Sequence, residues 1–193
     1  MSNTSNMTAP DVELEEVDMP EEDVVFEDAE VVLNAPMPVS FEFTGWKPLI
    51  FSENLSAECV VCLDFNMTDR AGDSAKLLEN AKEKILIDHH LDCSTDWELV
   101  ESRPKVAATG EIIFELIKLL TENISGEAAK GIYIAIMTDT GGCRYSNTTA
   151  TTHSILSEII DKVDNAYLSR MVLEIMSIDK LEIMKFALNN FEF

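Results

Sequence analysis

The sequence has no long apolar run and no recognisable leader. None of its hydrophobic stretches reaches the roughly 18 to 20 residues that a membrane-spanning helix needs. The first twenty residues, MSNTSNMTAPDVELEEVDMP, have neither the basic start nor the apolar centre of a signal peptide. These absences predict a cytoplasmic protein without membrane contact.

Basic residues are also scarce. The 193 residues include 14 Lys and Arg against 36 Asp and Glu, for a net charge of −22. No Lys or Arg precedes Lys47, and residues 11–42 contain twelve acidic side chains. Because phosphate contact dominates nucleic-acid affinity, this charge argues against binding of long DNA or RNA. Short oligonucleotides and nucleotides remain possible substrates, since a pocket with a metal ion can override the global field.

Cysteine is limited to four residues, of which Cys59 and Cys62 form a Cys-x-x-Cys pair. Structural zinc usually needs a second close pair, but Cys93 and Cys143 are isolated in the sequence. The pair also lies inside an apolar strand pattern. We therefore expect buried, reduced thiols in place of a zinc site.

Strand and helix patterns alternate along most of the chain. Residues 1–28 are acidic and aperiodic and are expected to be disordered. Residues 29–165 are expected to form one domain, followed by helices over 166–193. Alternating βαβ units predict an α/β fold with a parallel, Rossmann-like sheet covered by helices on both faces. The buried strands are expected at 58–65, 84–88 and 132–137, with a short strand at 30–33, and the helices at 69–82, 109–121, 151–163, 166–177 and 179–190.

Polar residues follow each expected buried strand. The first ends in Asp64, the second in Asp88-His89-His90, and the third in Asp139. The carboxyl ends of parallel strands form the ligand-binding edge of such a sheet, so we expect these side chains to converge. A single Asp there can be a cap or turn residue, and the Gly-Gly that follows Asp139 also fits a turn. Two of the chain's three histidines directly follow Asp88. A cap or turn role explains this pair less well than it explains a single Asp.

Clustered carboxylates repel one another. Two unit charges about 4 Å apart interact by about 4 kcal/mol at an effective dielectric near 20, so such a cluster binds a cation or takes up protons. Mixed carboxylate and imidazole ligands suit Mn²⁺ or Mg²⁺. The sequence therefore predicts a divalent metal site.

At these positions the chain resembles the DHH phosphoesterase superfamily. The similarity rests on three segments in order, VVCLDFNMTDR, LIDHHLD and GIYIAIMTDTGGCRYSNTT. The third segment is most similar in sequence to the RecJ-like, NrnA-type branch, which acts on short oligoribonucleotides and 3′-phosphoadenosine 5′-phosphate. Inorganic pyrophosphatase relatives are a weaker match.

The resemblance implies roles for individual residues. Asp64, His89 and Asp139 would bind Mn²⁺ or Mg²⁺, and Asp88 would orient a histidine. His90 and Arg144 would face the phosphate, which metal-activated water would attack.

The chain departs from the family pattern in two places. It has no counterpart of the first motif, a His and two Asp after an initial strand, or of the C-terminal substrate-binding domain that would follow 166–193. The resemblance therefore implies a homodimer or a completing partner chain. A catalytically inactive nucleotide- or metal-binding remnant is the alternative.

Overall fold

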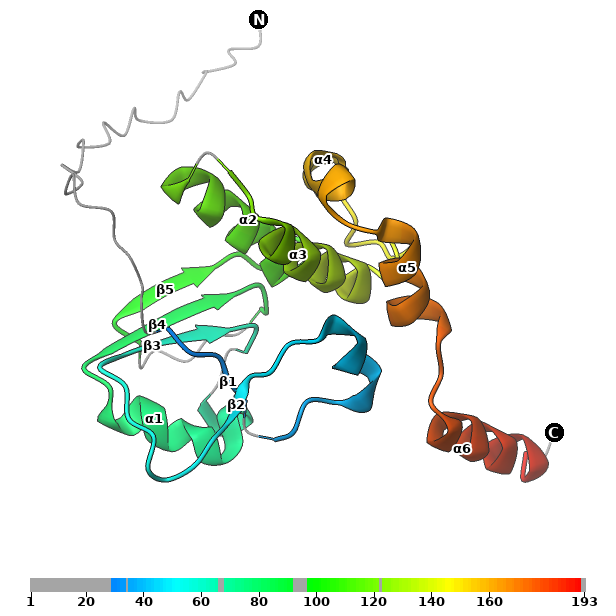
Figure 1. The fold of residues 1–193 in the computed structure, drawn as a ribbon, viewed down its shortest axis with the longest axis horizontal. Helices are drawn as coiled ribbons and strands as arrows, with labels where there is room; N and C mark the ends of the chain where they lie inside the picture. Colours follow the sequence, from blue (N-terminus) through cyan, green and yellow to red (C-terminus); the bar gives the residue numbers. More distant parts are fainter. Residues whose placement is uncertain (1–28, 34, 66–67, 92–96, 122, 192–193) are drawn as a thin grey trace, which may run out of the picture.

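The computed structural model describes residues 29–33, 35–65, 68–91, 97–121 and 123–191. They form an α/β fold in which parallel strands are flanked by helices, as predicted (Figure 1). Within these residues the strands make two sheets, one with the order β3-β4-β5 and one with the order β1-β2. The strands are β1 Val32–Leu33, β2 Leu49–Ile50, β3 Cys59–Leu63, β4 Glu83–Asp88 and β5 Leu99–Ser102.

The three-stranded sheet positions the candidate site residues at the ends of its strands. β3 and β4 lie where the apolar runs predict them, and they pair in parallel with Cys62 opposite Leu86. Leu86 is fully buried and shares a core with Cys62 and Leu78 of α1 (Ala75–Asn80), so α1 covers one face of the sheet. β5 is parallel to β4; it is not predicted from the sequence because it contains only two apolar residues.

The helix predicted over 69–82 is shorter than expected. A 3₁₀ segment, Thr68–Ser74, precedes α1, and the chain is non-helical at Gly72, where φ is 57° and ψ is −136°. This conformation is accessible mainly to glycine. Glycine therefore interrupts the helix that the apolar spacing predicts.

The prediction of a third buried strand at 132–137 is wrong. These residues lie in α3, Gly126–Asp139, which begins at the N-cap Ser125, whose side chain accepts a hydrogen bond from the Ala128 amide. The run IYIAIM is apolar all round because this helix is buried on most sides. Periodicity alone does not separate a buried helix from a buried strand.

α3 packs against the other helices to form a second core. α2 and α3 lie together over the sheet on the side opposite α1 (Figure 1). The buried residues of this second core include Ile132, Ile136 and Ile159. The remaining helical bounds are the 3₁₀ segment Val39–Thr44, α2 Thr109–Leu120, α4 Ala150–Ile159 with the 3₁₀ turn Ile160–Lys162, and α5 Asn165–Ser169 with the π-helical turn Arg170–Glu174.

Gly110 lets α2 and α3 pack closely. A Cβ atom added at Gly110 would lie 2.9 Å from the Cβ of Ala135 and 3.3 Å from the Ile132 carbonyl oxygen. We expect Gly110→Ala to lower the free energy of unfolding by about 1–3 kcal/mol, because neither neighbour can move without separating the helices.

Gly126→Ala is the matched control, since its added Cβ would meet only the Lys162 carbonyl oxygen at 3.8 Å. Urea denaturation of both variants measures the difference. Equal stabilities of the two variants would contradict this packing.

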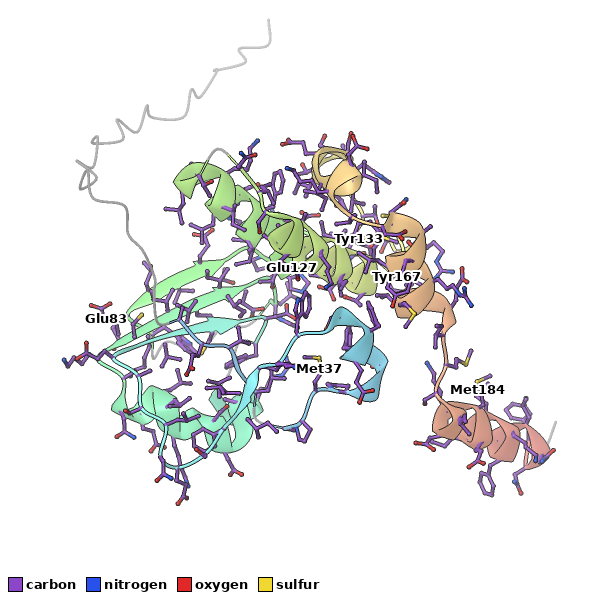
Figure 2. All side chains as sticks on the ribbon, viewed as in Figure 1. Met37, Glu83, Glu127, Tyr133, Tyr167 and Met184 are labelled. Atoms are coloured by element: carbon purple, nitrogen blue, oxygen red, sulfur yellow. The ribbon has the colours of Figure 1, made fainter. Side chains whose placement is uncertain are left out.

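α6, Ile178–Asn189, ends the described chain and buries none of its side chains. It lies apart from the helical layer, as Met184 shows relative to Tyr133 and Tyr167 in Figure 2. α5, by contrast, packs on α3: the hydroxyl of Tyr133 lies 2.7 Å from that of Ser169, and Leu168 is buried. Across the described residues, no helix combines the length and hydrophobicity that a bilayer crossing requires.

Candidate metal centre

Asp64 follows β3 directly and sits in the left-handed region, with φ of 66°. Its amide still donates to the Ile87 carbonyl at 3.1 Å, so pairing with β4 continues to this residue. Asp tolerates this conformation better than most residues. A strained residue at the end of an apolar strand is typical of a functional position.

Asp88, at the end of β4, is fully buried. Its Oδ1 accepts the backbone N–H of His89 at 2.8 Å and lies 2.7 Å from Nδ1 of His90. Its Oδ2 has no hydrogen-bond partner within the described part of the chain. The carboxylate therefore fixes the His90 ring with Nδ1 as donor, which leaves His90 Nε2 free to accept.

His89 lies between two further carboxylates. Its Nε2 is 3.6 Å from Oδ1 of Asp64 and 3.4 Å from Oδ2 of Asp139. Its Nδ1 lies 3.4 Å from the Val106 carbonyl oxygen, a long hydrogen bond in which only the imidazole can donate. This arrangement leaves the Nε2 lone pair facing the two aspartates, as in metal-binding histidines.

Asp139 reaches the cluster from the carboxyl end of α3, and not from a strand as predicted. Burial raises the pKa of its carboxyl, and the Asp64 charge raises it further. The end of a helix carries partial negative charge from unpaired carbonyl groups, which also disfavours a carboxylate. All three effects would be relieved by a bound cation.

Several hydrogen bonds that hold the site in place come from residues that no sequence pattern identifies. The hydroxyl of Thr109, at the start of α2, donates to Oδ1 of Asp64 at 2.7 Å. The side chain of Asn147 donates to the carbonyl oxygens of Ala107 and Asp139, both at 3.1 Å. These contacts join loops far apart in sequence, so only the three-dimensional structure identifies them.

Arg144 follows the turn after α3. Its Nε donates to the Gly141 carbonyl at 2.5 Å, which folds the side chain back on its own turn. Gly141, Gly142 and Cys143 all have positive φ, so Asp139 does lead into tight turn chemistry as well. The structure brings Asp64, His89 and Asp139 together; the role predicted for Arg144 toward phosphate stays a prediction.

The Cys59–Cys62 pair lacks the geometry of a zinc site. The two residues are three apart on β3 and so project to opposite faces. Cys62 is buried, and burial raises the pKa of its thiol to about 11, away from the thiolate that zinc needs. Cys59 is exposed, contrary to the expected buried thiol, because it lies on the face of β3 opposite the buried Cys62, together with the exposed Val61 and Leu63. Cys93 lies outside the described residues.

The donor set fits a divalent cation. Asp64, His89 and His90 each offer a ligand atom within 4.8 Å of the others, and Asp139 adjoins His89. Carboxylate oxygens with imidazole nitrogens match Mn²⁺, and carboxylates alone match Mg²⁺. Both imidazoles have their Nδ1 engaged, so each presents Nε2 without a change of tautomer.

Asp139→Asn is expected to stabilise the metal-free chain. Since folding raises the pKa of Asp139, ionisation of its carboxyl costs stability, and this cost grows as the pH rises from the ordinary carboxyl range through the raised pKa. Removing the charge should raise the thermal midpoint at pH 7 by about 1–3 °C, and by less at pH 4. Scanning calorimetry at both pH values measures this, and a lower midpoint at pH 7 would argue against the electrostatic cause.

No family model matches the sequence. The fold is similar to the crystal structure of an exopolyphosphatase-related protein from Bacteroides fragilis, with a TM-score of 0.75 and 28% identity over 85% of this chain. It is also similar to that of a putative family II inorganic pyrophosphatase from Methanococcus jannaschii, with a TM-score of 0.54 and 20% identity over 70% of this chain. The matches cover 52% and 46% of those chains, so this chain spans about half their length.

Proposed function

We propose that this chain is a module of a DHH-type phosphoesterase that binds Mn²⁺ through Asp64, His89 and Asp139. The observation that carries the proposal is the position of His89, whose Nε2 lies within 3.6 Å of both carboxylates while Val106 engages its other nitrogen. The structural likeness to an exopolyphosphatase-related protein supports phosphoester chemistry.

The substrate we propose is a short oligonucleotide or 3′-phosphoadenosine 5′-phosphate, following the wording of the Asp139 segment. A cation held by these residues would neutralise phosphate charge and make water a better nucleophile. Asp88 would act by holding His90, whose free Nε2 faces away from that contact and can meet a phosphate oxygen or a metal. Thr109 would hold the Asp64 carboxylate in place.

A metal- or nucleotide-binding module without hydrolysis is the second candidate. It is favoured by the exposure of Asp64, whose side chain is 53% accessible and meets described protein groups only at Thr109 and His89. Under this reading, binding persists and turnover does not.

Phosphate release separates the two candidates. The purified chain is incubated with Mn²⁺ and either 3′-phosphoadenosine 5′-phosphate or a dinucleotide, and Asp64→Asn serves as the matched inactive variant. Turnover that Asp64→Asn removes supports the phosphoesterase. Metal binding without turnover supports the second candidate, and turnover equal in both proteins would contradict the assigned site.

A further inference from the structure

Tyr145 is an exposed aromatic residue on the turn that follows Asp139. Its ring lies against Gly141: a Cβ atom added at Gly141 would be 2.3 Å from Cζ of the tyrosine and 2.6 and 2.7 Å from its two Cε atoms. Because these three distances are similar, the glycine meets the face of the ring and not its edge. Tyr145 is nevertheless 59% exposed, so the opposite face of the ring is open to solvent.

The turn holds this ring in place through its backbone. The amides of Arg144 and Tyr145 both donate to the Thr140 carbonyl oxygen, at 2.9 and 3.0 Å. Nε of Arg144 donates to the Gly141 carbonyl oxygen at 2.5 Å. Gly141 is therefore fixed from two sides, at its carbonyl by the arginine and at its α-carbon by the tyrosine ring. A ring that is ordered before binding loses little conformational entropy when a flat ligand stacks on it.

The same turn is tied to the metal centre. It begins directly after Asp139, and the Asn147 side chain near its end donates to the carbonyl oxygens of Asp139 and Ala107, both at 3.1 Å. Ala107 follows Val106, whose carbonyl oxygen lies 3.4 Å from Nδ1 of His89. A ligand with its phosphate at the metal centre therefore has this turn as an immediate neighbour.

A single exposed tyrosine is common on protein surfaces, and Tyr167 shows the usual arrangement. It is 46% exposed and packs edge-on against Phe43, with ring centroids 6.0 Å apart and an interplanar angle of 80°. Tyr145 pairs with no aromatic ring of the described residues. Within the same part of the chain, the neighbouring Arg144 forms no ion pair, although the net charge of the protein is −22. An open aromatic face and an available cation thus lie together beside the metal centre.

We propose that Tyr145 is a stacking platform for the nucleobase of the substrate, so that the site selects nucleoside phosphates over inorganic polyphosphate and pyrophosphate. The inference rests on the proposed phosphoesterase function and narrows its substrate class. Every base has a π-face, so an aromatic platform accepts any base and gives no affinity to a phosphate that lacks one. The terminal nitrogens of Arg144 would contact phosphate oxygens between the base and the cation.

Two ligands that differ in the presence of the base test this selection. Adenosine 5′-monophosphate and ribose 5-phosphate are titrated into the chain by calorimetry in millimolar Mn²⁺. We expect the adenosine ligand to bind about 5- to 100-fold more tightly, the range that one base–aromatic stack provides. Tyr145→Ala should abolish this difference and leave the affinities for ribose 5-phosphate and for Mn²⁺ unchanged.

Three further variants separate stacking from a structural role. Tyr145→Phe should keep the preference for the base, because the ring remains. Tyr145→Leu retains apolar bulk without a π-face and should lose most of the preference. Tyr167→Ala is the matched control, since it removes the other exposed tyrosine, and it should keep the full preference.

Equal affinity of the unmodified chain for the two ligands would overturn the platform, and Mn²⁺ binding in that sample would leave the proposed metal centre intact. A preference for the base that Tyr145→Ala retains would also overturn it, as would no binding of either ligand at millimolar concentration. A preference that Tyr145→Ala abolishes, in a chain that does not bind Mn²⁺, would uphold the platform and count against the proposed function alone.

Discussion

Replacing His89 by alanine is expected to weaken Mn²⁺ binding by at least about 100-fold. Its Nε2 is the atom placed between Asp64 and Asp139, at 3.6 and 3.4 Å. Without it, Asp64 and Asp139 lose the nitrogen that lies between them. Loss of outer contacts to a metal ligand already costs 10–100-fold in affinity, so loss of the ligand itself should exceed that range.

His153→Ala is the matched control. His153 is exposed on α4 and is the one other histidine in the sequence. Isothermal titration calorimetry of both variants, with circular dichroism to confirm folding, gives the comparison. Similar Mn²⁺ affinity in the two variants would show that binding does not use the centre described above.

Replacing Asp88 by alanine is expected to affect both the site and the fold. The fully buried carboxylate accepts the His89 amide and the Nδ1 proton of His90 through one oxygen. Its removal leaves the part-buried His89 amide without that partner, at a cost of about 1–3 kcal/mol, and it frees the His90 ring. We expect Mn²⁺ affinity to fall by about 10–100-fold as well.

Asp88→Asn separates the two effects. The asparagine side chain retains an oxygen that can accept both hydrogen bonds, so the folding loss should be small. Its neutral amide polarises His90 less, so a smaller loss of metal affinity should remain. Denaturation and calorimetry on the same samples measure both quantities. An alanine variant with unchanged stability and unchanged affinity would show that Asp88 holds neither histidine.

The two apolar strands and the α2 helix can be predicted from sequence because each has a simple local pattern. β3 and β4 are short apolar runs, and α2 carries an apolar stripe between polar ends. α3 has neither feature: burial on most sides removes its stripe, so its run resembles a strand. Its helix signals were the Ser125 cap and the Ala-rich turn that follows it.

The residues of the metal centre could be predicted from sequence, but the contacts that position them could not. Asp64, Asp88, His89 and His90 follow from strand ends alone. Asp139 reaches the same place from a helix and not from the predicted strand, because the carboxyl end of α3 also lies at this edge. The contacts from Thr109 and Val106 depend on how α2 enters the fold. Local sequence carries no signal for such contacts.

The position of β3 at the end of the described three-stranded sheet also could not be predicted from sequence patterns. The run CVVCL predicts a strand with neighbours on both sides, whereas among the described strands β3 pairs with β4 alone. Cys59 and Val61 lie on the face of β3 opposite Cys62 and are exposed, although the pattern predicts that they are buried.

Calorimetric titration of the metal-free chain with Mn²⁺ tests the central claim most directly. We predict saturable binding, at least 100-fold weaker after His89→Ala and unchanged after His153→Ala. Absence of saturable binding up to millimolar Mn²⁺, or binding that His89→Ala leaves unchanged, would contradict a metal centre formed by Asp64, His89 and Asp139.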